Sequence, residues 1–341
     1  MSVNRSGNAA IDVHAHFLPE SAVTAYRSGR AWHGIEFEAG RGGVPVAVTG
    51  ASRFAFGSPL HFEPFEKRIA LSEERGVDTE VLSLLPPLFR YDRPAPEGLA
   101  AAREHNDELS ELTVRYPGRF LGLATVPLQN AEFAAEEARR ALSLAGIVGV
   151  TIGTHVAGVN LDARELEPFF TVLDELSSFV LIHPIAPRDG MGALDQHYLR
   201  NVIGNPLETT IAAASLMASG RLEQYPQVNY CLAHGGGYTC AAMGRLAHAS
   251  RVRHEFTDRA LEVRADLHRR FYYDTLVHDE LTLRHLIDVV GSDHVLLGTD
   301  FPADMGQVDA AGFVRGSHML NMEEKASILS GNIRHILGEM R

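Results

Sequence analysis

Residues 11–16 read IDVHAH and place two histidines two residues apart at the end of a short apolar run. Alternate side chains of a β-strand point to the same face, so His14 and His16 can present their imidazoles to one metal ion. The pair alone is weak evidence, because an H-x-H arises often by chance and a lone histidine is more often structural than a ligand. The interpretation therefore depends on the strands that follow.

Three later apolar runs also end in a residue that can bind a metal ion or transfer a proton. FVLIHP delivers His183, NYCLAHGGG delivers His234 and HVLLGTD delivers Asp300. A hydrophobic strand with a functional side chain at its C-terminal end is typical of a (β/α)₈ barrel, whose active site collects at that face. The pattern predicts an α/β TIM barrel with its site at the mouth.

Strand-like and helix-like segments alternate along the rest of the chain, which favours a parallel sheet. Eight strands are expected, at residues 11–16, 80–85, 120–126, 149–152, 179–183, 229–233, 271–273 and 294–298. Apolar residues at three- and four-residue spacing predict helices between them, at 97–115, 131–144, 165–176, 209–219 and 280–290. No internal repeat or linker divides the chain, so we expect one domain over residues 1–341.

The chain is longer than a plain barrel, since 341 residues exceed the roughly 250 typical of this fold. The surplus falls mainly in residues 18–63, a glycine-rich segment with short β-like alternation. We expect this insertion to form a lid or small β unit over the barrel mouth, where loops carry specificity. A second long connection, residues 184–206, follows His183 and is expected to cover the site as well.

Composition excludes several classes of protein. With 45% hydrophobic and 22% charged residues, the chain can bury a large core and is not of a disordered type. The net charge of -12 argues against nucleic acid as a partner. No apolar run approaches the roughly 18 residues that span a bilayer, and the polar start lacks a signal-peptide core, so a cytoplasmic protein is expected. Cys231 and Cys240 do not make a disulfide framework, and Cys231 is expected to be a small buried hydrophobe.

Lysine usage bears on the number of metal ions. Binuclear metallohydrolases of the barrel class commonly bridge their metals with a carboxylated lysine on the fourth strand. Here only Lys67 and Lys325 occur, both in helix-like segments, and the fourth strand GVTIGTH has none. A mononuclear site is therefore favoured. Three imidazoles and one carboxylate suit Zn²⁺, although other divalent metals accept the same ligand types.

The ordered motifs resemble the amidohydrolase superfamily and, within it, aminocarboxymuconate semialdehyde decarboxylase and its relatives. Besides the H-x-H, they include EKRIALSEERGVDTEVLS, ATVPLQ, GVTIGTH, AHGGG and LLGTDFP, so the likeness covers most of the chain. The resemblance implies one Zn²⁺ ion per chain held by His14, His16, His183 and Asp300. It also implies that His234 stands beside the ion as an acid/base group and is not a principal ligand.

The resemblance further implies a homodimer that binds a small carboxylate substrate. In the family, an arginine eleven residues after the AHGGG histidine reaches into the neighbouring subunit's site, and Arg245 stands at that spacing. A second carboxylate-binding arginine is expected in the insertion, where Arg53 is the first candidate and Arg41 the next. The sequence departs from relatives that have a phenylalanine after the strand-eight aspartate and tryptophans after the strand-five histidine. Ala303 and a connection without tryptophan stand there instead, which leaves the substrate open.

The expected activity is the zinc-dependent, non-oxidative decarboxylation of an unsaturated or aromatic carboxylic acid. A zinc-bound water, whose pKa falls from about 15.7 toward about 7, would serve equally in a hydrolase or hydratase of a lactone, amide or ring-cleavage product. This alternative stays open. A non-catalytic scaffold is disfavoured, because a suitable residue stands at every metal-binding and acid/base position.

Other polar residues invite structural interpretations. His155 ends the fourth strand and is expected to be structural. Asp274 either orients a ligand or caps a helix. The triple glycine after His234 favours close backbone packing beside the metal, because no lysine follows it as in a phosphate loop. The remaining histidines are expected to lie in solvent or at helix caps, among them His33, His61, His105 and His197.

Overall fold

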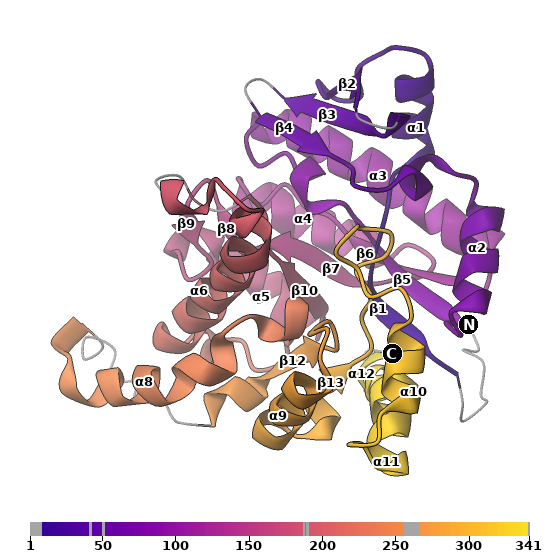
Figure 1. The fold of residues 1–341 in the computed structure, drawn as a ribbon. Coiled ribbons are helices and arrows are strands. Elements are labelled where there is room, and N and C mark those ends of the chain that lie inside the picture. The colour runs from indigo at the N-terminus through magenta and orange to yellow at the C-terminus, as the bar shows by residue number, and fades with distance from the viewer. Residues whose placement is uncertain are drawn as a thin grey trace.

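The computed structural model describes residues 9–40, 43–49, 52–186, 188, 191–255 and 266–339. Eight strands form one parallel sheet in the order β1-β5-β6-β7-β10-β11-β12-β13, as Figure 1 shows. They are β1 (Ile11–Phe17), β5 (Thr79–Leu84), β6 (Phe120–Ala124), β7 (Ile147–Gly153), β10 (Phe179–His183), β11 (Asn229–Leu232), β12 (Phe271–Asp274) and β13 (Val295–Leu296). Each lies where the sequence predicts a strand, within a few residues.

The first and last strands meet and close the sheet into a barrel. The Val13 amide donates to the Leu297 carbonyl oxygen at 2.9 Å, and the His16 amide donates to that of Phe301 at 2.7 Å. Asp12 adds a side-chain link, because its carboxylate accepts from the Thr299 amide at 3.1 Å and from the Thr299 hydroxyl at 2.5 Å. The predicted TIM barrel is confirmed, and its closure brings the C-terminal ends of β1 and β13 together.

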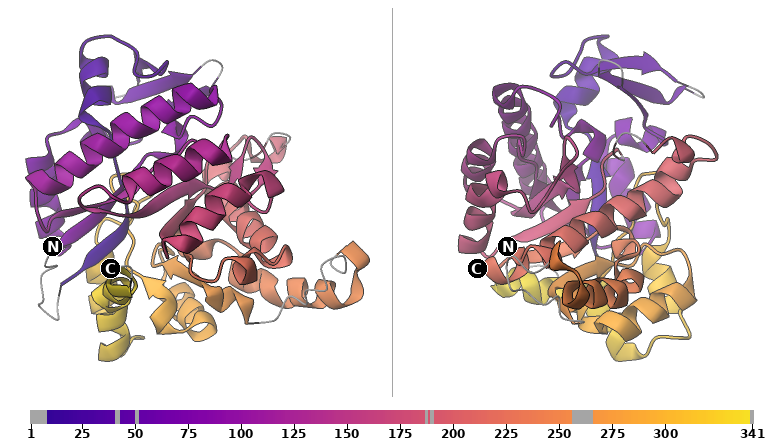
Figure 2. Two further views of the ribbon diagram at one scale, coloured as in Figure 1. Left: turned by 180° about the vertical axis from the view of Figure 1, so that it is seen from behind. Right: turned by 90° about the vertical axis from the view of Figure 1, so that its left-hand side faces the viewer.

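Helices surround the barrel (Figures 1 and 2). They are α2 (Phe65–Glu74), α3 (Ala95–Arg115), α4 (Ala131–Ala141), α5 (Glu167–Glu175), α6 (Asn205–Ala218), α7 (Arg221–Gln224), α8 (Thr239–Val252), α9 (Glu280–Val290), α10 (Ala310–Gly316), α11 (Met322–Ala326) and α12 (Asn332–Glu339). The five predicted helices correspond to α3, α4, α5, α6 and α9. Helix α9 matches its predicted bounds, and Asp279 caps it by accepting from the Thr282 amide at 2.8 Å.

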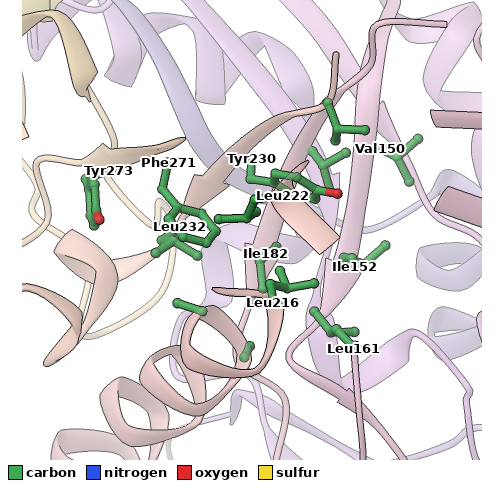
Figure 3. Close-up of a cluster of buried hydrophobic side chains, with 14 of the residues drawn as sticks. Val150, Ile152, Leu161, Ile182, Leu216, Leu222, Tyr230, Leu232, Phe271 and Tyr273 are labelled. Carbon is green, nitrogen blue, oxygen red and sulfur yellow. The ribbon is translucent and has the colours of Figure 1, made fainter. Parts of the chain in front are cut away.

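Side chains of β10 alternate between two apolar clusters. Val180 and Ile182 pack outward against the helices, in the layer that Figure 3 shows between the strands and α6. Phe179 and Leu181 point into the barrel interior, together with Cys231, which is fully buried as predicted. Because side chains of a strand alternate between faces, His183 shares the inward face with Phe179 and Leu181.

The insertion after β1 contains a small β unit, as predicted. It comprises α1 (Glu20–Arg27) and an antiparallel sheet of β2 (Glu36–Ala39), β3 (Pro45–Thr49) and β4 (Ser52–Ala55), followed by the 3-10 helix η2 (Pro59–Phe62). Its apolar face packs on the segment after β5, where Phe56 clusters with Leu85 and Leu88. The small sheet therefore lies at the C-terminal end of the barrel strands.

The second long connection also has local structure near its anchor points. A short hairpin of β8 (His155–Val156) and β9 (Val159–Asn160) lies beside it. Arg188 links the connection to that hairpin by donating to Asn160 Oδ1 at 2.6 Å, and it also pairs with the buried Glu208 of α6. Among the helices of the described ranges, none is both long and apolar enough to cross a membrane.

Candidate metal centre

Four histidine rings form a closed group at the mouth of the barrel. His14 and His16 come from β1, His183 ends β10, and His234 follows β11. The ring centroid of His14 lies 5.1 Å from that of His16, 4.9 Å from that of His183 and 5.3 Å from that of His234. The His183 centroid lies 4.9 Å from that of His16 and 5.0 Å from that of His234. Residues from three strand ends are thus brought together as the sequence predicts.

Asp300 faces this group, and its two carboxylate oxygens lie near different histidines. Its Oδ1 lies 2.9 Å from His16 Nε2, 3.4 Å from His14 Nε2 and 4.0 Å from His183 Nε2. Its Oδ2 lies 3.5 Å from His234 Nε2. Atoms that each bind one divalent ion at about 2.0–2.2 Å stand roughly 3–4 Å from one another. The spacing around Oδ1 fits a single ion.

An alternative set of ligands for a divalent metal ion includes His234. The ligand atoms of His14, His183, His234 and Asp300 all lie within 4.8 Å of one another, and three of these residues are buried. His16 adjoins this set through its contact with Asp300. The structure therefore places His234 beside the other candidate ligands, as expected, and both His16 and His234 border the site.

Hydrogen bonds on the far side of the rings prepare the histidines to bind a cation. His14 Nδ1 lies 2.6 Å from Asp274 Oδ2, and His183 Nδ1 lies 2.7 Å from the Pro184 carbonyl oxygen. Both partners only accept, so each Nδ1 carries a hydrogen, and Nε2 is the nitrogen that remains to bind a metal ion. The Nε2 atoms of His14, His16 and His183 are buried without a hydrogen-bond partner in the described part of the chain. Orphaned, inward-facing nitrogens of this kind fit metal ligands.

Asp274 connects two members of the site. Besides holding His14, its carboxylate accepts from the His234 amide at 2.9 Å and from the Gly235 amide at 2.7 Å. Burial alone would raise the pKa of Asp274, but the hydrogen bond and charge of His14 outweigh it and lower the pKa. Of the two interpretations of Asp274, orientation of a ligand is the one that these contacts support.

The electrostatics of the group suit a cation. Burial opposes the charge of Asp300, yet the imidazoles of His14, His16 and His234 close to its carboxylate hold its pKa well below the ordinary value. Burial lowers the pKa of His16 and, strongly, that of His183, so both stay neutral. Burial also acts to lower the pKa of His14, but Asp274 and Asp300 raise it to about 10. A bound cation would compete for the lone pair that this proton occupies.

Two residues of the site have an unusual backbone conformation. His234 has φ 56° and Asp300 has φ 57°, in the left-handed region that residues other than glycine seldom adopt. Gly237 has φ 61°, and a Cβ there would lie 2.1 Å from the Pro206 carbonyl oxygen. A Cβ on Gly298 would lie 2.7 Å from that of Asp274. The glycines beside the metal group therefore serve close packing, as expected.

The single chain does not bring the two predicted arginines to the metal group. Arg53 lies on the outward face of β4, where its side chain is 57% exposed and pairs with Glu38. Arg245 is exposed on α8, which projects away from the barrel in Figure 1. Arg41 lies outside the described residues. His155 is held structurally, since its Nε2 lies 3.2 Å from the Ala186 carbonyl oxygen and its Nδ1 accepts from the Gly158 amide at 3.2 Å.

Two histidines expected in solvent or at helix caps are buried, so that expectation was wrong for them. His61 of η2 is 5% exposed and His105 of α3 is fully buried. Burial lowers the pKa of each to about 3. Their burial arises from contacts between distant segments, which no local pattern reveals.

An aromatic residue at the mouth was also missed. Tyr198 lies in the connection that lacks tryptophan, and its hydroxyl is 3.5 Å from Asp304 Oδ1. Partial burial, followed by the charges of Asp304 and Asp300, raises the pKa of Tyr198. The only signal in the sequence was the position of this tyrosine in a long connection after a metal-binding strand.

Comparison with known proteins agrees with this geometry. A curated relative, 2-amino-3-carboxymuconate-6-semialdehyde decarboxylase of Dictyostelium discoideum, is 29% identical over 340 residues, covering 96% of this chain and 91% of the relative. Gamma-resorcylate decarboxylase of a Rhizobium species is 29% identical over 255 residues, covering 70% of this chain and 76% of the relative. The expected resemblance to the aminocarboxymuconate semialdehyde decarboxylase branch is confirmed.

A solved structure shares the fold. The dihydroxybenzoic acid decarboxylase of a Polaromonas species, with bound manganese and the inhibitor 2-nitroresorcinol, superposes with a TM-score of 0.76 at 22% identity, covering 98% of both chains. The family model for amidohydrolases matches residues 11–338, nearly the whole chain. The protein belongs to the amidohydrolase family.

Proposed function

We propose that the protein is a metal-dependent, non-oxidative decarboxylase of an aromatic or unsaturated carboxylic acid. The observation that carries the proposal is the arrangement of three orphaned imidazole nitrogens around Asp300 Oδ1, with His234 on Oδ2. The relatives described above are named as decarboxylases, which supports this reaction over hydrolysis.

We assign His14, His16, His183 and Asp300 to one divalent ion per chain. Imidazole nitrogen and carboxylate oxygen suit zinc, the metal that the sequence favours, and also manganese, which the Polaromonas structure contains. When bound, the ion supplies a fixed positive charge that orients and polarises oxygen atoms of the substrate. Neither lysine of the chain lies at a strand end, since Lys67 lies in α2 and Lys325 in α11. A carboxylated lysine that would bridge two metal ions is therefore not available, which supports a single ion.

His234 is assigned to proton transfer. Its Nε2 faces Asp300 Oδ2, while its Nδ1 is buried and has no hydrogen-bond partner among the described atoms. In the reaction, a proton adds to the carbon that bears the carboxylate, and the bond from that carbon to the carboxylate breaks. The electron pair of that bond remains in the unsaturated framework, and CO₂ leaves. A positioned imidazole that delivers this proton contributes typically 10²–10⁴-fold to the rate.

Recognition of the substrate carboxylate is assigned to Arg245 of a neighbouring subunit. Arg245 lies on the exposed side of a projecting helix, and no ion pair of its side chain is found within the described ranges. A free guanidinium can bind a carboxylate through two parallel hydrogen bonds. Arg53 is the second candidate, and it would have to leave Glu38 to serve this purpose.

A panel of substrates tests the reaction class. Protein loaded with Zn²⁺ or Mn²⁺ is incubated with carboxylated muconates and hydroxybenzoates, and headspace CO₂ is measured beside the decarboxylated product. We expect metal-dependent CO₂ release from at least one member, and release slower by on the order of 10²–10⁴-fold from His234→Ala. Hydrolysis of lactones or amides, with no CO₂ from any carboxylate, would instead establish the hydrolase alternative.

A further inference from the structure

His61 lies in the segment that leads from the insertion into α2. This segment contacts the chain near the C-terminal ends of both β1 and β13. At one end, Gly57 touches the loop after β13, because a Cβ on Gly57 would lie 3.1 Å from Asp304 Cγ. At the other end, Arg68 of α2 donates from Nη1 to the His16 carbonyl oxygen at 2.6 Å. His61 lies between these two contacts in η2. It therefore belongs to a segment that is anchored on both sides at the strand ends that supply His16 and Asp300.

His61 is a buried polar side chain whose ring nitrogens make no hydrogen bond of normal geometry with the described residues, while the Phe56 backbone lies near enough to raise its pKa slightly against the effect of burial. Only 5% of the residue is exposed, and neither ring nitrogen has a hydrogen-bond partner in the part of the chain that the structure describes. The ring interacts electrostatically with His16 and Asp300, and its centroid lies 5.6 Å from that of Phe56. A buried polar group without a hydrogen bond destabilises the folded state, so few of them occur in native proteins and each calls for an explanation.

The imidazole of His61 is neutral. Burial lowers its pKa to about 3, and the nearby His16 and Arg68 act in the same direction. A cation bound beside Asp300 would lower the pKa further. A neutral imidazole offers one N–H donor and one lone pair, so it can bind an oxygen atom of a ligand without adding charge to the site.

His105 shows that burial alone does not single out His61. Its ring nitrogens are also buried without partners within the described atoms, and burial also lowers its pKa to about 3. However, burial is the only influence on that pKa, and the ring packs against Phe17 with centroids 4.9 Å apart. Of these two histidines, His61 is the one that combines unpartnered nitrogens with an electrostatic interaction with two residues of the metal group, His16 and Asp300.

We propose that His61 is a substrate-binding residue, whose neutral imidazole donates a hydrogen bond to an oxygen atom of the substrate at the side of the site closed by the insertion. The inference rests on the proposed decarboxylase function. It gives the insertion a direct part in selecting substrates that carry a hydroxyl, carbonyl or carboxylate oxygen at that side. His61 would thus act beside the metal ligands and His234, without binding the metal itself.

Three variants test the assignment in Mn²⁺-loaded full-length protein. His61→Leu removes the donor at similar size, His61→Gln keeps an N–H donor, and His105→Leu is the matched control for loss of a buried histidine. The measurements are the Kd for 2-nitroresorcinol by titration calorimetry, the KM and kcat for the best carboxylate of the panel, bound metal and Tm. We expect His61→Leu to raise Kd and KM roughly 10- to 100-fold with metal content unchanged. His61→Gln should recover most of the binding, and His105→Leu should change Tm but not Kd or KM.

Two results would count against the assignment, and they are distinguishable. If the wild type binds the probe and releases CO₂, but His61→Leu and His61→Gln both keep its Kd and KM, the role of His61 is wrong while the decarboxylase function stands. If the wild type neither binds the probe nor releases CO₂ from any carboxylate, the proposed function fails and this inference fails with it. Should His61→Leu not fold, His61→Asn replaces it, because its donor is too short to reach. Equal binding by His61→Asn and His61→Gln would then overturn the proposal.

Discussion

At the scale of the residue, two hydrogen-bond acceptors determine what His14 and His183 can do. The Asp274 carboxylate and the Pro184 carbonyl each require an N–H on the ring nitrogen Nδ1, which leaves Nε2 for a metal ion. The histidines and Asp300 were predictable as candidates, because each stands at the end of an apolar strand, and the structure brings them together. The partner of His14 was not predictable, because Asp274 is 260 residues away and only barrel closure brings the two together.

His183→Ala should remove both metal and activity. Wild-type protein is expected to hold about one equivalent of divalent metal per chain, because the ligand set surrounds one oxygen of Asp300. Elemental analysis of dialysed protein measures the stoichiometry, with His155→Ala as the control histidine outside the site. Active wild-type enzyme without metal, or with two ions per chain, would contradict the mononuclear centre.

His234→Ala distinguishes the two possible roles of His234, which are proton transfer and metal binding. If His234 transfers the proton, the variant keeps most of its metal and loses on the order of 10²–10⁴ in turnover. Metal content and kcat are measured on the same preparation. A variant that purifies free of metal would make His234 a ligand, and His16→Ala would then be expected to retain the ion.

His105 should contribute to acid sensitivity. Its pKa is lowered by burial to about 3, so between that value and the ordinary one near 6.5 the unfolded chain binds a proton that the folded chain does not. Stability is therefore present above the ordinary pKa and is lost as the pH falls through this window, by about 2 kcal/mol between pH 7 and pH 5. Urea unfolding at both pH values measures it. His105→Leu should show a smaller loss on acidification than the wild type, and an equal loss would show that His105 is not buried in the neutral form.

At the scale of the element, local patterns predict what local contacts stabilise. The bounds of β10 and α9 match the prediction, because a continuous apolar run and an amphipathic helix with an aspartate cap are local signals. Helix α8 was not predicted, since the few residues that it buries at helical spacing, Thr239, Met243, Ala247 and Ser250, are small or polar apart from the methionine. The arrangement of α2 against the barrel depends on buried charges rather than on an apolar pattern. Arg68 and Arg75 both pair with the buried Glu80, and both lie over the Phe301 ring.

Arg68→Met should lower the free energy of unfolding more than the same substitution at the exposed neighbour Lys67 does. The change removes a guanidinium bond to Glu80 at 2.5 Å and one to the His16 carbonyl oxygen at 2.6 Å. Leaving a buried carboxylate short of its partner costs about 3 kcal/mol, although Arg75 retains part of the pairing. Lys67→Met is the control, because its ion pair with Glu63 is half exposed and contributes at most about 1 kcal/mol. Chemical denaturation compares the two, and equal midpoints would show that the buried network does not stabilise the fold.

At the scale of the whole molecule, the described chain contains the metal group but leaves the two candidate arginines, Arg53 and Arg245, on exposed surfaces. Figure 1 shows α8 extending from the barrel, and Figure 2 shows the same helix from two further sides. A helix that leaves its own barrel exposes Arg245 to another molecule. The proposed assignment of Arg245 therefore predicts a dimer in which each site needs one residue from its neighbour.

Mixed dimers test this sharing. Homodimers of Arg245→Ala and of His234→Ala should both be nearly inactive, because every site lacks one group. After subunit exchange between the two variants, one site of each heterodimer has both defects and the other has neither. Random mixing makes about half of the dimers heterodimers, so activity should recover to roughly a quarter of wild type. A mixture of His183→Ala with His234→Ala is the control, because both residues come from the same chain's site and every heterodimer site remains defective. If the first mixture stays as inactive as the control after exchange is verified, Arg245 acts within its own chain or not in the site, and the functional reason for an obligatory dimer disappears.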